Sequence, residues 1–370
     1  DRTLRQKNSG KSIGGRYIMS KKLSKQKLND IITYGIVIAA FVIMQILINA
    51  GEISSLFQGL MVPLCTYIIL AISLNLVVGI LGELSLGHAG FMCVGAFTSS
   101  FFSKAMQDTI TNSTVRFLLA LLIGIITAAI FGIIIGIPVL RLNGDYLAIV
   151  TLAFGEIIKN LVNVLFIGKD SKGFHFSTKD AVSLNMEPDG KIILNGPQGI
   201  TGTPNDSTFF IGFILILVTL FIVLNLIHSR DGRAIMAIRD NRIAAESIGI
   251  NITKYKLMTF TISAAMAGAA GVLYAHNLSN LTANTNNFGY NMSINILVFV
   301  VLGGIGNIRG SIIAAVVLTL LPELLRGMSD YRMLIYAIVL IVMMLFNWAP
   351  KAIEWREKHL SFKKNKKEAA

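Results

Sequence analysis

Few residues in this sequence could do chemistry, and most of them lie inside strongly apolar segments. Glu156 and Lys159 are three residues apart, so they share one face of a helix and can pair. Ionisable groups inside a membrane span often line a transport path, but a structural ion pair with Lys159 extending outward is the interpretation we prefer. His88 could titrate, although a lone histidine beside glycines is more typical of a hydrogen-bonded packing residue.

His88 belongs to the first of two glycine-rich breaks in the apolar pattern. Residues 79–91 read Gly-Ile-Leu-Gly-Glu-Leu-Ser-Leu-Gly-His-Ala-Gly-Phe, and residues 303–311 read Gly-Gly-Ile-Gly-Asn-Ile-Arg-Gly-Ser. A broken helix can direct its N-terminal amides at an anionic group such as a carboxylate, whereas glycines also serve plain helix packing, which we prefer for any single one. The candidate path residues are Ser85, Gly87, His88, Gly90, Glu156, Gly303, Gly304 and Gly306.

Patterns that would indicate an enzyme are missing from the sequence. Gly10-Lys11-Ser12 resembles the end of a phosphate-binding loop, but Arg5 replaces the first glycine and no strand precedes it. No Ser-His-Asp set, paired carboxylates or metal-ligand spacing occurs in a plausible site. Cys65 and Cys93 lie in apolar runs, where they are expected to be packing residues. We therefore expect no catalysis, no bound cofactor and no metal site in this chain.

The composition indicates a membrane protein. The 370 residues are 54% hydrophobic and 14% charged, with a mean hydropathy of +0.66, whereas soluble domains carry about a quarter charged residues. The net charge of +13 is also compatible with nucleic-acid binding. However, Lys and Arg sit in tails and short loops beside apolar runs, which is a membrane-topology pattern. The expected partner surface is lipid and not nucleic acid.

The apolar runs predict an all-α, polytopic membrane bundle of about 8–10 transmembrane helices, because backbone groups within a bilayer must be satisfied internally. Two of the ten runs, 89–102 and 311–325, are short and suggest broken helices, and the two breaks suggest an internal duplication of two halves. A transmembrane domain at 31–348 lies between basic tails at 1–30 and 349–370, and residues 1–18 are excluded from fold reasoning. The ten runs are 31–49, 61–78, 89–102, 116–140, 146–167, 208–228, 256–276, 292–308, 311–325 and 331–348.

The positions of the basic residues predict an orientation. Short cytoplasmic loops are enriched in Lys and Arg, and the lysines before the first run place the N-terminus inside. An even number of crossings then places the C-terminus inside as well, with the loop at 229–255 on the same side. The segment 168–207 falls outside, and its Asp189-Gly190 pair between two β-capable stretches suggests a hairpin turn.

The cytoplasmic loop contains a polar segment, 231–249, whose apolar residues recur at helical spacing. Asp231 is the expected N-cap of one amphipathic helix, and Gly249 is the expected C′ residue. An interfacial anchor that contacts lipid headgroups explains this pattern. A docking helix for a separate ATP-hydrolysing subunit explains it equally well, since a helix joined directly to two spans transmits movement.

The second interpretation gains support from a family resemblance. Residues 239–250, Arg-Asp-Asn-Arg-Ile-Ala-Ala-Glu-Ser-Ile-Gly-Ile, resemble the coupling segment of branched-chain amino-acid ABC importer permeases of the LivM type. The broader Glu-Ala-Ala-x-x-x-Gly importer pattern is matched at Ala244, Ala245 and Gly249, but Ile243 stands in place of Glu and the downstream proline is missing. Both glycine breaks, 143–156 and 196–202 also resemble family motifs, so the likeness runs from about residue 74 to 325.

The resemblance implies a permease subunit in the bacterial plasma membrane. Its implied partners are a second homologous permease, two ATP-binding subunits that use the ATP and Mg, and an extracytoplasmic substrate-binding protein that delivers leucine, isoleucine or valine. The residues implied to couple the chain to the ATPase are Arg233, Arg239, Ala244, Ala245, Glu246 and Gly249.

Three other interpretations stay open at this point. Related permeases for urea, nucleosides or sugars share the architecture. An ion- or proton-coupled carrier would need a titratable relay, for which Glu156 and His88 are the candidates. A passive channel would need no docking loop.

Overall fold

The computed structural model describes residues 30–50, 54–142, 144–188, 190–325 and 331–348. The chain forms two compact units, Asp1–Gly59 and Leu60–Ala370. In the first unit the structure describes the apolar helix Asp30–Asn49 and the start of α2 (Ser55–Asn75). The predicted basic tails, apart from Asp30, lie outside the described residues. The elements that could form a site belong to the second unit.

Long apolar helices make up most of the second unit, as bilayer burial of a polar backbone requires. Among the described residues of the whole chain, six helices are long and apolar enough to cross a membrane. The predicted helical membrane bundle is therefore confirmed. The long helices of this unit are α2, which continues into the π-helix η1 (Leu76–Leu81), α4 (Ser113–Val139), α5 (Asp145–Val164), α6 (Phe209–His228) and α9 (Ile252–Ala275).

Four further helices coincide with the other predicted runs. They are α3 (His88–Ala105), α11 (Tyr290–Gly303), α12 (Ile308–Leu324) and α13 (Arg332–Trp348). The predicted run at 89–102 was too short, because α3 has 18 residues and would extend about 27 Å at 1.5 Å per residue. In its polar last turns the buried hydroxyl of Ser99 is satisfied by donating to the carbonyl of Ala96 at 3.0 Å. The predicted run at 292–308 was too long, because α11 ends at the second glycine break.

Small residues hold the centre of the bundle together. Helix α9 packs against α3 and α4, and a Cβ added at Gly95 of α3 would overlap the backbone of Gly268 of α9. A Cβ added at Gly268 would in turn overlap Ala128 of α4. Close backbone approach through small residues is the usual way in which helices associate in lipid. The outer faces of α4 and α6 are apolar and exposed, as lipid contact requires, at Leu118, Leu122, Ile126, Ile130, Phe210, Ile214, Val218 and Phe221.

A small antiparallel sheet follows α5. Its strands β1 (Phe166–Asp170), β2 (Gly173–Ser177) and β3 (Lys191–Asn195) lie in the order β2-β1-β3, and the short 3₁₀ helix η2 (Val182–Leu184) lies between β2 and β3. The predicted hairpin turn at 189–190 is wrong, since β2 and β3 do not pair; Asp189 itself lies outside the described residues. The turn instead joins β1 to β2, where Asp170 accepts from the amides of Lys172 and Gly173 at 2.9 and 3.1 Å.

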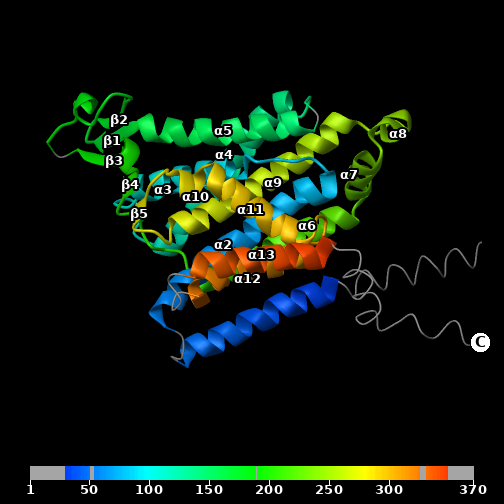
Figure 1. Cartoon of the computed structure of the whole chain (residues 1–370). Coiled ribbons are helices and arrows are strands. Elements are labelled where there is room, and N and C mark those ends of the chain that lie inside the picture. The colour runs from blue at the N-terminus through cyan, green and yellow to red at the C-terminus, as the bar shows by residue number, and fades with distance from the viewer. Residues whose placement is uncertain (1–29, 51–53, 143, 189, 326–330, 349–370) are drawn as a thin grey trace, which may run out of the picture. The chain divides into compact units, whose positions relative to one another are not determined.

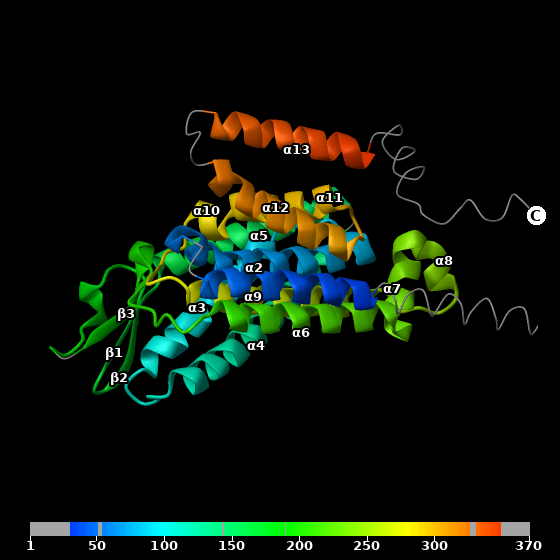
Figure 2. The same cartoon turned by 90° about the horizontal axis from the view of Figure 1, so that it is seen from below.

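A two-stranded pairing connects the segment after this sheet to the loop between α9 and α11. The 3₁₀ helix η3 (Gly196–Gln198) leads into β4 (Ile200–Thr201), which pairs with β5 (Asn280–Leu281), and the short helix α10 (Thr285–Phe288) follows. Figures 1 and 2 show β1–β3 at one end of the bundle and the α7–α8 loop at the opposite end. The two elements thus lie at opposite ends of the bundle, and the placement of segments 168–207 and 229–255 on opposite sides of a membrane stays a prediction.

The polar loop forms two helices and not the single one expected. Helix α7 (Arg230–Asp240) begins at the N-cap Ser229, whose hydroxyl accepts from the amide of Gly232, so the prediction of Asp231 as N-cap is wrong. Helix α8 (Arg242–Ser247) begins after Asn241, which has an extended backbone and accepts from the amide of Ala244. Asn241 therefore ends α7 with its extended backbone and caps α8 with its side chain.

Candidate functional site: two glycine breaks and the α7–α8 loop

The first glycine break connects a π-helix to the buried helix α3. Helix α2 gives way at Asn75 to η1, and the non-helical residues 82–87 then lead to His88, the first residue of α3. A π-helical turn is rare and often occurs at a functional site. The loss of the regular α-helical pattern leaves backbone groups in this region to be satisfied from elsewhere in the bundle.

The predicted path residues of the first break are buried. The His88 ring lies 2.6 Å from the Ser73 hydroxyl, and both side chains are buried. The Ser85 hydroxyl is buried with no hydrogen-bond partner among the described residues. A Cβ added at Gly87 would overlap the carbonyl of Thr151, and one added at Gly90 would lie 2.7 Å from Gly155 Cα. These contacts fit the packing interpretation of the glycines and of His88, and a role of these residues in a transport path stays a prediction.

The second break lies directly against the first. Gly304 ends α11 and Gly306 follows it, both with left-handed backbones, and Gly303 packs against Gly310. Gly306 donates its amide to Asn75 Oδ1 at 2.9 Å, while Asn75 Nδ2 donates to the Ser311 hydroxyl at 2.9 Å.

Sequence reasoning missed Asn75, which holds the two breaks together. Its side chain is fully buried, and an amide inside an otherwise apolar run was the signal available for finding it.

Glu156 and Lys159 form the predicted ion pair, and they also bind other elements. Lys159 Nζ lies 2.5 Å from Glu156 Oε2 and donates to Thr285 Oγ1 at 3.2 Å. Glu156 Oε1 accepts the backbone amide of Tyr290, the first residue of α11, at 2.8 Å. A carboxylate at a helix N-terminus satisfies an amide that has no partner within the helix. The pair therefore ties α5 to α10 and α11. The expectation that Lys159 extends outward is wrong, because Lys159 is buried and its ammonium binds Thr285.

A second buried ion pair was not predicted. Glu83, in the first break, pairs with Lys256 near the start of α9, and their side chains are 14% and 3% exposed. The available signal was a lone carboxylate between the glycines of residues 82–87, with no cation near it in sequence. This pair connects the break to the base of α9.

The α7–α8 loop is held to the bundle by a small apolar cluster. Ile238 of α7, Ala245 of α8 and Ile252 of α9 are buried together. Ala245, predicted to couple the chain to an ATPase, therefore positions α8 and does not face outward. Arg233, on α7, donates to the carbonyl of His228 at 3.3 Å.

The end of α8 has the predicted glycine cap. Gly249 has a φ of +85° and donates to the carbonyl of Glu246, and Ile250 donates to that of Ala245. These two bonds form a Schellman motif, so the prediction of Gly249 as C′ residue is confirmed. The exposed residues of this loop include the predicted Ala244 and Glu246 together with Ile243 and Ile248, which are 81% and 74% exposed.

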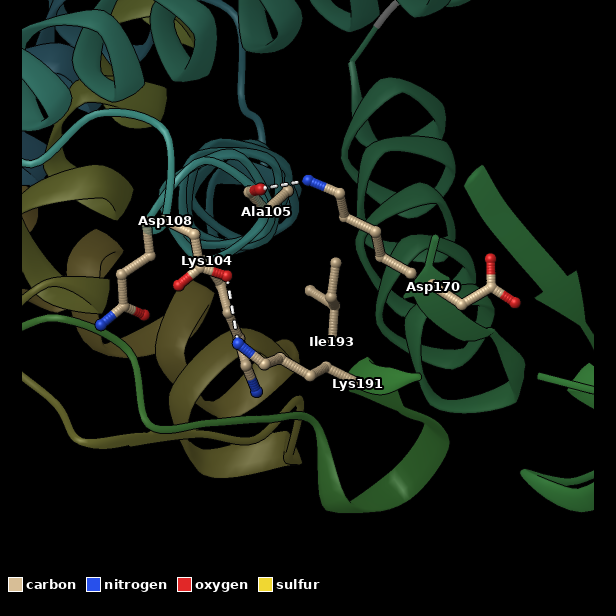
Figure 3. A pocket seen from close by; sticks show the side chains of 8 residues that line it. Lys104, Ala105, Asp108, Asp170, Lys191 and Ile193 are labelled. Carbon is tan, nitrogen blue, oxygen red and sulfur yellow. Dashed lines mark hydrogen bonds and ion pairs between the residues drawn. The ribbon is translucent and has the colours of Figure 1, made fainter. Parts of the chain in front are cut away.

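The cavity at the other end of the bundle is about 270 Å³ and lies between the end of α3 and the sheet. Three lysines line it, and each is bound: Lys104 to the Thr201 carbonyl at 2.6 Å, Lys169 to the Ala105 carbonyl at 2.9 Å, and Lys191 to Asp108 at 3.1 Å. Figure 3 shows the contact between Lys191 and Asp108. The three lysines therefore connect the strands to the end of α3, and the cavity is the space between these contacts.

Asp170 also lines the cavity and holds the turn between β1 and β2. Burial by itself raises the pKa of the Asp170 carboxyl, but it is outweighed by the amides of Lys172, Glu187 and Gly173 and by the His175 ring, which lower it. The net pKa lies below its ordinary value, so the carboxyl is ionised and fully engaged at neutral pH. Among the described residues, no group of three or more His, Cys, Asp or Glu side chains could hold a metal ion.

Comparison with known proteins defines the family. Residues 55–346 match the family described as the permease component of the branched-chain amino acid transport system. The chain belongs to this permease family. It is 35% identical over 296 residues to the high-affinity branched-chain amino acid transport permease LivM of Salmonella typhimurium, covering 78% of this chain and 67% of that protein.

Two further relatives align over more of their own length. The fructose import permease FruG of Bifidobacterium longum is 25% identical over 344 residues, covering 90% of this chain and 94% of that protein. The branched-chain permease LivH of Escherichia coli is 25% identical over 286 residues, covering 76% and 89%. No solved structure matches this chain.

Proposed function

We propose that this chain is a transmembrane subunit of an ATP-driven importer that moves a branched-chain amino acid delivered by an extracytoplasmic binding protein. The observation that carries the proposal is the α7–α8 loop at the end of the bundle opposite the sheet (Figure 1). Ser229 is both the C-cap of α6 and the N-cap of α7, so no flexible linker separates the loop from a membrane helix. Such a loop can transmit force from an ATPase.

The remaining partners follow from the same proposal. The sheet end faces the binding protein, and the α7–α8 end faces two ATP-binding subunits in the cytoplasm. Both termini lie in the cytoplasm in this proposal, as the basic residues beside the apolar runs predict. A second permease completes the pathway, in keeping with the likeness to both LivM and LivH. The binding protein supplies affinity and ATP-driven closure supplies direction, so this chain needs no strong substrate site of its own.

Co-purification followed by reconstitution tests this function. The tagged chain is purified from its native membrane, co-purifying permease and ATPase subunits are identified, and the complex is placed in vesicles with the binding protein. Leucine, isoleucine or valine is expected to stimulate ATP hydrolysis and nucleotide-dependent uptake. Fructose is included because FruG aligns with most of this chain. Stimulation by fructose and by none of the three amino acids would show that the substrate is a sugar and not a branched-chain amino acid. Uptake by the purified chain without nucleotide would instead establish a secondary carrier.

The exposed Ile243 of α8 provides a test of docking. Ile243→Asp introduces a charge where the proposal places an apolar contact with the ATPase, so co-purified ATPase is expected to fall at least tenfold. Val182→Asp is the matched control, because Val182 is 84% exposed at the opposite end of the bundle. Both variants should insert and purify normally. Equal ATPase recovery with the two variants would show that α8 is an interfacial anchor.

A substitution at Glu156 distinguishes the importer hypothesis from the hypothesis of a proton-coupled carrier. Glu156→Gln keeps an acceptor for the Tyr290 amide but leaves Lys159 without its counter-charge. The variant is expected to melt at a lower temperature in detergent, while uptake per folded complex stays within about twofold of wild type, because removing one partner leaves a buried charge uncompensated. Abolished uptake with unchanged melting would place Glu156 on the transport path.

A further inference from the structure

A chain of hydrogen bonds connects α7 to both glycine breaks. At the end of α7, Arg239 Nη1 donates to the carbonyl of Gly79, in η1, at 3.0 Å. Gly79 is among the last four residues of η1, whose carbonyls have no donor within their own helix. Arg239 thus supplies a charge-assisted bond to an orphan carbonyl, which is stronger than a bond between neutral groups.

The stem of Arg239 is fitted against the same break. A Cβ added at Gly82 would lie 2.6 Å from Arg239 Cγ, so the absence of a side chain there makes room for the arginine. The remaining donors of Arg239, Nε and Nη2, bind the neighbouring Asp240 at 3.1 and 3.0 Å. The packing of the stem against Gly82 and the bonds to Asp240 together hold the guanidinium in the orientation that reaches Gly79.

Gly79, which accepts from Arg239, also contacts the second break. A Cβ added at Gly79 would overlap both Asn75 Oδ1 and the backbone of Gly306, so the two breaks meet there without intervening side chains. Asn75 bridges them through its bonds to Gly306 and Ser311. A displacement of Gly79 therefore has to move Gly306 or break these bonds.

We propose that Arg239 is the positioning residue through which movement of α7 reaches the two glycine breaks. This inference rests on the proposed function, because it assumes that an ATPase moves α7. When α7 shifts, the guanidinium pulls the Gly79 carbonyl, and the close contact and the Asn75 bridge carry the displacement to the start of α12. Arg239 thereby couples ATP hydrolysis to the opening of the bundle, and it acts without contacting substrate.

The test measures uptake and ATP hydrolysis in the same reconstituted complex. Arg239→Gln is expected to retain ATPase co-purification and basal hydrolysis, whereas uptake per ATP hydrolysed falls at least tenfold. Arg239→Lys should lose less than threefold, because the bond to Gly79 uses one donor and a lysine ammonium can supply it. Arg230→Gln is the control: Arg230 is exposed on the same helix and makes no side-chain hydrogen bond or ion pair within the described part of the chain.

The outcomes separate this inference from the proposed function. If the wild-type complex shows no ATP-dependent uptake, the proposed function fails regardless of the variants. If the wild-type complex shows ATP-dependent uptake and Arg239→Gln retains uptake per ATP hydrolysed within twofold of wild type, the inference about Arg239 fails and the proposed function stands. Loss of ATPase co-purification would make Arg239 a docking contact and would also overturn it. Arg239→Met, which keeps the stem beside Gly82, replaces the Gln variant if that does not fold, and failure of both to fold would assign Arg239 a purely structural role.

Discussion

Replacing Lys256 by methionine is expected to destabilise the folded chain by about 3–5 kcal/mol, because the substitution leaves the Glu83 carboxylate buried without its partner. Lys256 is 2% exposed, and no other ion pair involving Glu83 occurs among the described residues. The loss is measured as a lower melting temperature in detergent and as less monodisperse protein after mild heating.

A double variant distinguishes the stability lost through the unpaired charge from the stability lost through side-chain packing. Glu83→Gln combined with Lys256→Met removes both charges, and it should recover most of the stability lost in the single variant, since replacing a buried pair by neutral groups is often close to neutral. Lys254→Met is the control, because Lys254 is exposed two residues earlier on α9. A loss as large in the double variant as in Lys256→Met would show that side-chain packing, and not the unpaired charge, dominates.

The helices could be predicted from sequence because the bilayer leaves the chain few options. An apolar run of about 20 residues must be helical to satisfy its backbone in lipid, so runs such as 116–140 and 208–228 correspond to α4 and α6 within a few residues. Local capping chemistry was less decisive. Ser229, Asp231 and Asn241 all favour a cap, and helical spacing alone does not show which of them interrupts a polar helix.

Contacts between distant segments could not be predicted in this way. Asn75 and Gly306 are 231 residues apart, and Glu83 and Lys256 are 173 apart. Asn75 is a visible exception as a polar group in an apolar run, and Glu83 is one as a charge among glycines. No local pattern shows which of them meet, because that depends on how the helices pack. The sequence therefore identified the glycine breaks as unusual without indicating that they touch.

The contact between the breaks predicts a large effect at Gly79. Gly79→Val places a branched side chain where even a single Cβ would overlap Asn75 and the backbone of Gly306. Backbone atoms cannot rotate away as a flexible side chain can, so the two breaks must separate, and overpacking of this kind typically costs 1–3 kcal/mol or more. We expect uptake in the reconstituted complex to fall at least tenfold, while ATPase recruitment persists because α8 lies outside the contact.

Gly155→Ala is the matched control for this substitution. An added Cβ at Gly155 of α5 would lie 3.7 Å from the amide of Gly90, which is ordinary van der Waals contact, so uptake should stay near the wild-type level. Asn75→Leu provides an independent probe, because it removes the bonds to Gly306 and Ser311 without inserting a side chain at Gly79. Loss of uptake in Gly79→Val and Asn75→Leu together would indicate that transport depends on the joined breaks. Normal uptake in both would show that the two breaks act separately, in which case movement of α7 would have to reach the pathway through α9 and the Glu83–Lys256 pair.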